Sequence, residues 1–446
     1  MKKVFAVTMV LALTLALTSA ALAAVPAPGG PFNSAFRVQN LEGSTAQCSY
    51  AFYDAAGSAA YTSAVTSVNP GDSLYVYVPD VSGLGSGSYS AVVSCDKKVA
   101  AVSNFSDSNS GASYSGVAAP GTNWFAPGIY DNYYSFYSNV VVQNASASAV
   151  DVTVEIFAPG SATPVKTQSA TGVPANASVA FEQEGLPELA DNQFYSAKIT
   201  GTGNIAPIVN IYGKGSTDNQ LYSYNAFTAG STTAYAPVIM SNYFGYNTAL
   251  VVQNIGSSSA SVTVTYTNGH SDSYTVAPGA AESIYTPGVA GVPSGNTLYG
   301  ATVTSDQDVV VLVNESTPTT NRAASYSGFA AGSTEVRAPI VEKRYYGYNS
   351  SVTCQNVGSA ATDLTVTYVG TGVGSPTTYA GVAAGATQLI YQPTDPALAS
   401  VPPNWIGSAT ITGTQPFVCV VNQDMNEAPN ASIVMDQLFS YNGIEP

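Results

Sequence analysis

A Gln-Asn pair that recurs four times at nearly constant spacing constrains the fold of this chain more than any other feature. The intervals between successive pairs are 104, 110 and 102 residues. The four pairs are Gln39-Asn40, Gln143-Asn144, Gln253-Asn254 and Gln355-Asn356. An aromatic residue stands seven positions before each Gln, at Phe32, Phe136, Tyr246 and Tyr348. Self-similarity at a fixed period of this length predicts four copies of one structural unit.

The segment that begins eight positions after each Asn has the alternating pattern of a β-strand. In the third copy Val262, Val264 and Tyr266 alternate with threonines, which predicts one buried face and one wet face. Two later apolar runs, residues 299–303 and 309–313, predict two more strands in that copy. A strand with a tyrosine closes each copy, at Tyr114, Tyr224, Tyr326 and Tyr441. About seven short strands in roughly 105 residues, without helical periodicity, predict an all-β chain of four β-sandwiches of the immunoglobulin-like type.

The register of the copies also predicts domain boundaries. We expect a signal peptide over residues 1–23 and then four repeats, numbered 1 to 4 from here on. Their expected bounds are 24–118, 119–229, 230–331 and 332–446. A proline stands sixteen positions before the Gln in repeats 2 to 4, whereas Pro28 stands only 11 positions before Gln39. Repeat 1 is therefore predicted to have a shortened first strand.

The N-terminus has the composition of a secretory leader. Lys2 and Lys3 precede a short uncharged apolar run, and Ala21-Leu22-Ala23 offers small residues for cleavage. No later run approaches the roughly 18 apolar residues that a membrane helix needs, so we expect a secreted chain without membrane insertion after cleavage. Only 9% of residues are charged and the formal net charge is −15. The low content of charged residues and the negative net charge argue against binding to nucleic acid or anionic lipid.

The four cysteines are expected to pair, because exported cysteines usually form disulfides. Cys354 is in phase with Val352, and Cys419 is in phase with Phe417, so both are predicted to point inward from the second and the penultimate strands of repeat 4. Cys48 and Cys95 fall on the third and the fifth strands of repeat 1. We therefore predict the bridges Cys48–Cys95 and Cys354–Cys419, each within one repeat.

No constellation of catalytic residues emerges from the sequence. The one histidine, His270, follows the Asn268-Gly269 turn with no partnered cysteine nucleophile. The densest acidic groups are Glu182, Glu184, Glu188 and Asp191, then Asp306 with Asp308. We interpret them as solubilising loop charges, with calcium at one of them as the alternative. The segment 107–111 resembles a calcium loop only in part, and we predict no enzymatic activity, no metal and no cofactor.

An aromatic segment recurs between the Ala-Pro pair and the Gln-Asn pair of repeats 2 to 4. Its candidate functional residues are Tyr134, Tyr137, Tyr243, Tyr246, Tyr345 and Tyr348. One interpretation is packing against the preceding repeat, since Tyr can bury its ring and keep its hydroxyl wet. The other is a row of platforms that stack on sugars or on the side chains of a partner protein. Both interpretations stay open at this point.

The Val-Gln-Asn strand, the alternating third strand and the terminal Tyr strand resemble the tandem immunoglobulin-like, cell-adhesion-related repeats of secreted bacterial or archaeal surface proteins. In that resemblance Cys354–Cys419 matches the inter-sheet disulfide of immunoglobulin domains. The resemblance implies a rod of four domains in a structural or adhesive surface role, such as a surface-layer, filament or stalk component. The alternative function is carbohydrate binding through exposed Tyr rows. Expected partners are a surface protein or a glycan, with self-association through an open sheet edge of repeat 1.

Overall fold

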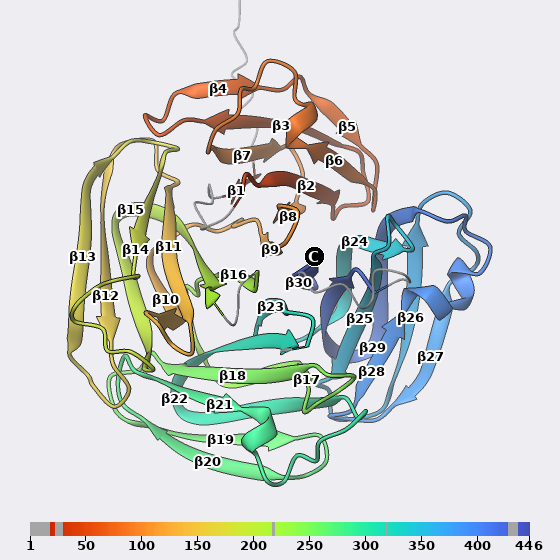
Figure 1. The fold of residues 1–446 in the computed structure, drawn as a ribbon. Helices are drawn as coiled ribbons and strands as arrows, with labels where there is room; N and C mark the ends of the chain where they lie inside the picture. Colours follow the sequence, from red (N-terminus) through yellow and green to blue (C-terminus); the bar gives the residue numbers. More distant parts are fainter. Residues whose placement is uncertain (1–17, 23–29, 216–218, 318, 427–435) are drawn as a thin grey trace, which may run out of the picture.

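The computed structural model describes residues 18–22, 30–215, 219–317, 319–426 and 436–446, and this part of the chain is all-β (Figure 1). Repeat 1 contains a five-stranded sheet of order β1-β7-β3-β4, in which β5 also pairs with β3, and a four-stranded sheet of order β6-β2-β8-β9. The strands of repeat 1 are β1 (Thr18–Leu22), β2 (Asn33–Asn40), β3 (Ala46–Tyr53), β4 (Ala59–Thr62), β5 (Thr66–Val68), β6 (Ser73–Tyr77), β7 (Ser90–Cys95), β8 (Val99–Ser106) and β9 (Gly111–Ser115).

Repeats 2, 3 and 4 each form one seven-stranded sheet with the same strand order. The strands of repeat 2 are β10 (Gly121–Tyr130), β11 (Phe136–Asn144), β12 (Val150–Phe157), β13 (Pro164–Val173), β14 (Ser178–Glu182), β15 (Phe194–Gly213) and β16 (Leu221–Asn225). Those of repeat 3 are β17 (Ser231–Ile239), β18 (Asn247–Asn254), β19 (Ala260–Tyr266), β20 (Ser271–Val276), β21 (Ala281–Tyr285), β22 (Tyr299–Thr317) and β23 (Arg322–Ser327). Those of repeat 4 are β24 (Ser333–Lys343), β25 (Asn349–Asn356), β26 (Thr362–Val369), β27 (Thr377–Val382), β28 (Thr387–Tyr391), β29 (Trp405–Asp424) and β30 (Leu438–Asn442).

One long strand organises each of these three sheets. The first half of β15 pairs with β10 and β12, and its second half pairs with β11 and β16. The sheet therefore curls over a single core, in which the alternating residues Val152, Val154 and Ile156 are all buried. The prediction of two separate strands at residues 299–303 and 309–313 is wrong, because one long strand, β22, runs through both segments.

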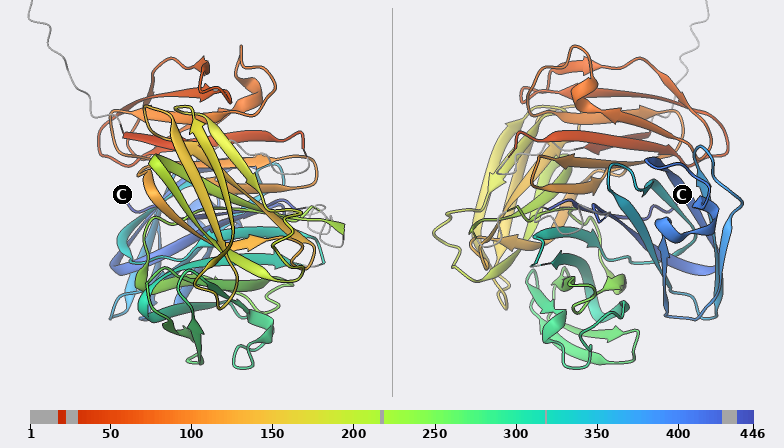
Figure 2. Two further views of the ribbon diagram at one scale, coloured as in Figure 1. Left: turned by 90° about the vertical axis from the view of Figure 1, so that its left-hand side faces the viewer. Right: turned by 45° about the vertical axis from the view of Figure 1, so that its right-hand side comes forward.

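The four repeats close into a ring, and the expected rod is wrong (Figure 1). The last strands of the repeats, β9, β16, β23 and β30, contact one another in cyclic order near its centre, and Figure 2 shows the ring from two other sides. Repeat 4 contacts repeat 1 directly, since the Ser113 hydroxyl donates to the Ser440 carbonyl at 2.6 Å. Each aromatic segment faces the following repeat, not the preceding one as expected. A head-to-tail interface of this kind closes into a ring when its rotation permits.

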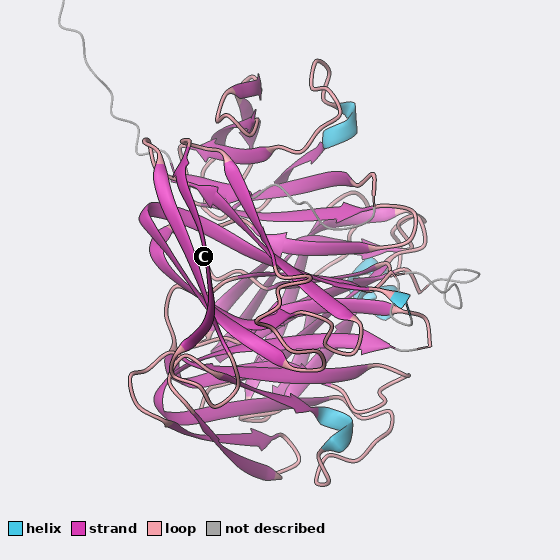
Figure 3. Ribbon diagram, turned by 60° about the vertical axis from the view of Figure 1, so that its left-hand side comes forward, coloured by secondary structure: helices cyan, strands magenta, loops and turns pink. Residues whose placement is uncertain are grey.

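Helical structure in the described residues is limited to short 3₁₀ turns (Figure 3). They are η1 (Val78–Asp80), η3 (Thr286–Gly288), η4 (Gln392–Thr394) and η5 (Pro396–Leu398). The turns η1, η3 and η4 follow the equivalent strands β6, β21 and β28 and contain a proline near their start. They therefore repeat the same local structure.

The Gln-Asn pair is a structural element of each repeat. The Asn254 amide donates to the carbonyls of Ser258 and Val276, both at 2.8 Å, and its oxygen accepts from the Gly256 N–H at 2.9 Å. The Asn residues of the other three repeats make the same three contacts. The Asn thus forms the turn after its strand and, in repeat 3, ties that turn to the end of β20. The neighbouring Gln253 reaches the Ala197 carbonyl of repeat 2 at 3.2 Å.

Substituting Asn254 with alanine is expected to lower the free energy of unfolding by about 2–4 kcal/mol, because it leaves buried backbone groups without partners. Asn254 is fully buried, whereas Asn268 makes similar turn contacts in an exposed position. The substitution Asn268→Ala is therefore a matched control with an expected loss below about 1 kcal/mol. Thermal unfolding of the two variants side by side would measure the difference, and equal losses would contradict the structural role of the pair.

The tyrosine of the last strand in repeats 2 to 4 stabilises the backbone next to the Ala-Pro pair. The first strands β10, β17 and β24 each contain a bulge just after their Ala-Pro pair. The Tyr326 hydroxyl lies in the bulge of β17, where it accepts from the Val238 N–H at 3.1 Å and donates to the Val238 carbonyl at 2.7 Å. Tyr224 and Tyr441 do the same with Gly128 and Ile340. The side chain thus replaces the ladder bonds that the bulge interrupts.

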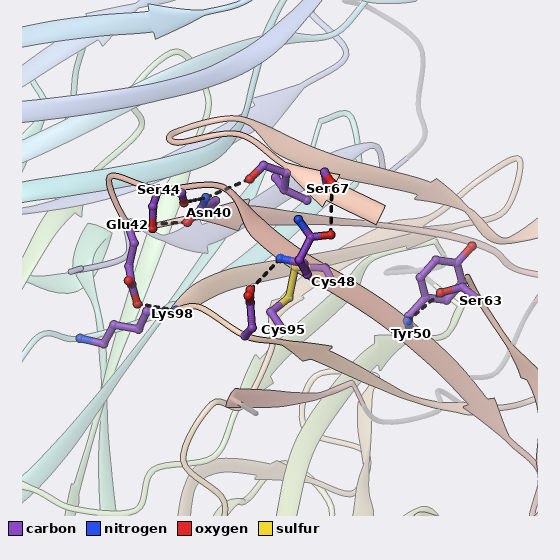
Figure 4. The surroundings of a disulfide bond; sticks show 12 residues. Asn40, Glu42, Ser44, Cys48, Tyr50, Ser63, Ser67, Cys95 and Lys98 are labelled. Atoms are coloured by element: carbon purple, nitrogen blue, oxygen red, sulfur yellow. Dashed lines mark hydrogen bonds between the residues drawn. A yellow bond between two sulfur atoms is a disulfide. The ribbon is translucent and has the colours of Figure 1, made fainter. Parts of the chain in front are cut away.

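Both disulfides, Cys48–Cys95 and Cys354–Cys419, pair as the repeat register predicted. The expected match to an inter-sheet disulfide is wrong, however, because each bridge joins neighbouring strands of one sheet. Cys48 on β3 lies directly opposite Cys95 on β7, with the Cα atoms 4.2 Å apart (Figure 4). Cys354 on β25 lies opposite Cys419 on β29 at 4.1 Å. Both bridges are buried and fix the register of their strand pairs.

Most of the expected signal peptide lies outside the described residues. Its residues 18–22 form β1, which pairs with β7 as β10 pairs with the first half of β15. The strand has 5 residues, whereas β10, β17 and β24 have 10, 9 and 11. Leader cleavage after Ala23 would remove β1 and leave this edge of β7 open.

Candidate ligand-binding face of the ring

Each aromatic segment forms a tight turn that displays one aromatic side chain. In repeat 2 the backbone groups of Tyr133 and Phe136 exchange two hydrogen bonds of 2.9 Å. The residues between them, Tyr134 and Ser135, have φ angles of +51° and +68°. Left-handed conformation at both central residues is the requirement of a type I′ turn. Residues 243–246 and 345–348 form the same turn in repeats 3 and 4. We refer to these three segments as the aromatic turns.

The displayed residue of each aromatic turn is among the most exposed large side chains of the molecule. Tyr134 is 68% exposed, Phe244 70% and Tyr346 72%. All three have left-handed φ angles, which cost an L-residue about 1–2 kcal/mol that glycine avoids. Repeat 1 has Gly30 at the equivalent position, nine residues before its Gln, with φ of +86°. Three repeats thus hold an aromatic where glycine would be less strained, which indicates a role for the side chain itself.

A second segment of each repeat holds the aromatic turn in place. The Asn296 side-chain oxygen accepts from the Phe244 N–H at 3.1 Å, and that of Asn404 accepts from the Tyr346 N–H at 3.1 Å. Asn192 takes the same position beside Tyr134 at 3.4 Å. Each displayed ring also packs edge-on against the preceding tyrosine, with centroids 4.8 or 4.9 Å apart. The turn is therefore preorganised by contacts within its own repeat.

The three aromatic turns lie on the same face of the ring. The repeats follow one another around its centre through the same head-to-tail interface, so rotation about the centre relates equivalent residues. Tyr134, Phe244 and Tyr346 consequently occupy equivalent positions in three successive repeats. We call this surface the aromatic face.

A cleft of about 560 Å³ opens beside the first aromatic turn, between repeats 2 and 3. Its volume falls within the usual range of about 300–1,000 Å³ for small-molecule sites. The side chains that line it are aromatic, aliphatic or neutral and polar. They are Tyr130, Tyr133, Tyr134, Phe136, Ile211, Gln220, Tyr222, Ala249, Ser283, Tyr285, Asn314, Ser316 and Asn321. None of these described lining residues is charged.

The aromatic rings of this cleft are fixed by one another and by the neighbouring repeat. Tyr130 and Tyr133 are stacked with centroids 5.2 Å apart and planes 11° apart, and Phe136 meets Tyr222 edge-on at 5.5 Å. Asn314 of repeat 3 donates to the Tyr130 hydroxyl at 3.4 Å. Burial raises the pKa of Tyr130 and of Tyr133, so both hydroxyls stay protonated at neutral pH. The cleft is a preformed aromatic site with hydrogen-bonding groups at its margin.

A second cleft, of about 550 Å³, opens on repeat 1 at the equivalent position. In repeat 3 the register pairs Ala249 with Tyr285 and Asn314, all of which line the first cleft. In repeat 1 the same register pairs Ala35 with Tyr77 and Asn104, which line the second. The second cleft differs in that Asp107 also lines it, which makes it anionic.

The structure divides the six predicted aromatic site residues between the two interpretations. Of the six, only Tyr134 is exposed. The exposed residues of repeats 3 and 4, Phe244 and Tyr346, were not predicted and stand next to the predicted Tyr243 and Tyr345. Tyr137, Tyr243, Tyr246, Tyr345 and Tyr348 are half-buried. The Tyr246 hydroxyl donates to Asp424 of repeat 4 at 2.6 Å, and that of Tyr348 donates to Gln437. Within one aromatic turn, some residues thus pack against neighbouring segments and another is displayed to solvent.

The charged residues considered as candidates lie apart from the two clefts described above, except Asp107. His270 contacts Asp272 at 2.9 Å. Glu184 forms an ion pair with Lys214 at 2.5 Å, and Glu188 forms one with Lys166 at 2.7 Å. The Asp107 carboxylate accepts from the backbone N–H groups of Gly30, Asn109 and Ser110 at 2.7–3.0 Å. Among the residues that the structure places, no cluster of three His, Cys, Asp or Glu side chains could hold a metal ion.

No protein-family model and no curated protein sequence matches this chain. Solved structures with local similarity include the Thermotoga maritima protein 1070, at 12% identity and a TM-score of 0.21 over 24% of this chain and 94% of that one. A tetra-tandem repeat from the extending region of a large adhesion protein has 13% identity and a TM-score of 0.13 over 90% and 92%. A Streptomyces avermitilis alpha-L-rhamnosidase in complex with L-rhamnose has 10% identity and 0.13 over 88% and 55%. Such low scores establish no common fold with the whole ring.

Within the described residues, no helix has the length and apolar character needed to cross a bilayer. The two disulfides suit an oxidising environment outside the cell.

Proposed function

We propose that this protein is a non-enzymatic, secreted adhesion protein that attaches to a surface partner through its aromatic face. The observation that carries the proposal is the repeated display of Tyr134, Phe244 and Tyr346 in a backbone conformation that favours glycine. Exposed aromatic side chains supply large contact area at low cost in conformational entropy, and they are enriched where proteins bind partners. Three such side chains on one face would also act together, since linked contacts raise the overall avidity.

Secretion through residues 1–23 and a relation of each repeat to immunoglobulin-like adhesion domains belong to the same proposal. The disulfides support export, because bridges of this kind persist in oxidising compartments. The curled sheet over a single core supports a sandwich-like repeat, although its same-sheet disulfides separate it from antibody domains. The low charge of the chain favours a partner recognised by apolar and hydrogen-bonding contacts over one held by ion pairs.

Removing the three displayed side chains is expected to reduce adhesion at least about tenfold, because an aromatic contact contributes about 0.5–1.5 kcal/mol and three act together. The test compares beads coated with residues 24–446 with beads coated with the variant Tyr134→Ser/Phe244→Ser/Tyr346→Ser. Retention under flow is measured on cells of the producing organism and on immobilised glycans and extracellular proteins.

Val65→Ser/Val165→Ser is the matched control, since both valines are exposed apolar residues outside the aromatic turns. Its retention should equal that of the unmodified protein. Equal retention of the triple variant would show that the aromatic face does not carry adhesion.

A further inference from the structure

We propose that the cleft between repeats 2 and 3 binds a neutral oligosaccharide. The inference rests on the proposed adhesive function and names the chemistry of the partner. It starts from the composition of the cleft, in which six of the thirteen lining residues are aromatic and none is charged. Without a charged group, the cleft offers no ion-pair partner to a phosphate, a carboxylate or a cation.

The aromatic rings supply the apolar part of sugar recognition. One face of a pyranose ring consists of C–H groups, and such a face packs against an aromatic ring that already has a fixed orientation. The half-buried rings of Tyr133 and Phe136 are fixed by their contacts with Tyr130 and Tyr222, which are buried. A rigid aromatic wall loses little entropy when the ligand binds. The cleft is thus preorganised for a flat ligand with an apolar face.

Neutral polar groups supply the rest of the recognition. Amide side chains at Gln220, Asn314 and Asn321 and hydroxyls at Ser283 and Ser316 line the same cleft. Amides and hydroxyls both donate and accept hydrogen bonds, which matches the dual character of a sugar hydroxyl. The Asn314 amide donates to the Tyr130 hydroxyl, and its oxygen accepts from the Ser325 hydroxyl. These two hydrogen bonds fix the position of the Asn314 side chain in the cleft wall. The combination favours a polyhydroxylated neutral ligand over a hydrocarbon.

The mouth of the cleft indicates that the ligand is longer than one sugar ring. Tyr134 from repeat 2 and Tyr285 from repeat 3 both line it, and they are 68% and 53% exposed. They therefore extend the aromatic surface beyond the enclosed part, onto the aromatic face. A ligand held between them contacts two repeats, which makes the closed ring a condition for binding.

The approximate symmetry of the ring provides a control residue. Tyr77 of repeat 1 has the register position of Tyr285 but lines the second, anionic cleft. If a saccharide binds in the cleft, Tyr134→Ala and Tyr285→Ala should weaken its binding about two- to twelvefold each, because one aromatic platform contributes about 0.5–1.5 kcal/mol. Tyr77→Ala and Val165→Ala should leave its affinity unchanged. All four side chains are exposed, so these substitutions remove little of the core.

The experiment screens residues 24–446 on an array of neutral and anionic oligosaccharides and then measures the dissociation constants of the best neutral ligand by calorimetry. The proposal expects neutral ligands, one site for each chain, and the stated division between the four variants. Binding confined to anionic glycans, or equal affinity of all four variants, would overturn it. If no saccharide binds but adhesion still depends on the aromatic face, this inference fails while the proposed function stands. Unchanged adhesion of the triple variant would instead refute the proposed function.

Discussion

Replacing Asp436 with alanine is expected to open the ring and to lower the free energy of unfolding by about 3–6 kcal/mol, since several buried hydrogen bonds are lost together. Asp436 of repeat 4 is fully buried near the centre of the ring and contacts the other three repeats. Its carboxylate accepts from the Leu221 N–H of repeat 2 at 2.6 Å and from the Ala323 N–H of repeat 3 at 2.8 Å. Its own N–H donates to the Asn109 carbonyl of repeat 1 at 2.7 Å.

The substitution would leave the N–H groups of Leu221 and Ala323 buried without an acceptor, and each such group costs about 1–3 kcal/mol. The four hydrophobic cores lie mainly within single repeats, so we expect the sheets to survive while the ring opens. Small-angle scattering should then show a larger radius of gyration, and thermal unfolding should begin at a lower temperature. Asp191→Ala, at an exposed position, serves as the control. A variant with unchanged size and unfolding temperature would show that Asp436 does not hold the ring together.

The ring gives the aromatic turns a common direction that a rod would not give them. In a rod, successive repeats rotate about the long axis, and equivalent side chains point to different sides. Closure places them on one face, so they can contact one flat partner at the same time. The polar centre, in which Arg322 of repeat 3 pairs with Asp424 of repeat 4 at 3.0 Å, specifies which repeats meet. The same interface between repeats therefore closes the ring and places the exposed aromatic side chains on one face.

The sequence predicted what depends on local pattern and on counting. The alternation at Val262, Val264 and Tyr266 identified a half-buried strand, and all three side chains are buried. Comparison between repeats placed Cys354 and Cys419 correctly with respect to each other. It did not tell whether the two lie across a sandwich or side by side, because strand order depends on contacts between distant segments. The resemblance to immunoglobulin domains implied the wrong strand order, because it placed the two cysteines on different sheets.

The remaining features depend on interactions that leave no fixed spacing in the sequence. Asp436 forms hydrogen bonds with backbone groups of repeats 1, 2 and 3. Any residue type could supply these backbone groups, so the sequence does not identify the partners of Asp436. The Asn residues that hold the aromatic turns lie 58, 52 and 58 residues after the displayed side chain, which hides them from a search at constant offset. The left-handed turn was a detectable signal, since Gly245 and Gly347 follow the displayed residues in repeats 3 and 4.

A second large effect is expected from pH, because Glu315 is buried at the junction of repeats 3 and 4. Burial raises the pKa of Glu315 from 4.5 to about 8, opposed by the hydrogen bond from Asn422 at 2.7 Å and reinforced by the charge of Asp424. Burial also raises the pKa of Glu342 to about 7. Both carboxyls therefore keep their protons in the folded protein at pH values where the unfolded chain has released them.

The folded state binds more protons than the unfolded state between pH 4.5 and about 8, so stability must fall as pH rises through that window. One pKa unit corresponds to about 1.4 kcal/mol, and Glu315 alone should make the protein about 3–5 kcal/mol less stable at pH 8 than at pH 5. Glu315→Gln keeps an acceptor for Asn422 and cannot ionise, so its free energy of unfolding should vary less with pH. Glu188→Gln, at an exposed position, should retain the dependence of the unmodified protein. Urea unfolding at pH 5, 6.5 and 8 measures all three proteins, and a stability that rises with pH would contradict a protonated Glu315 at the junction.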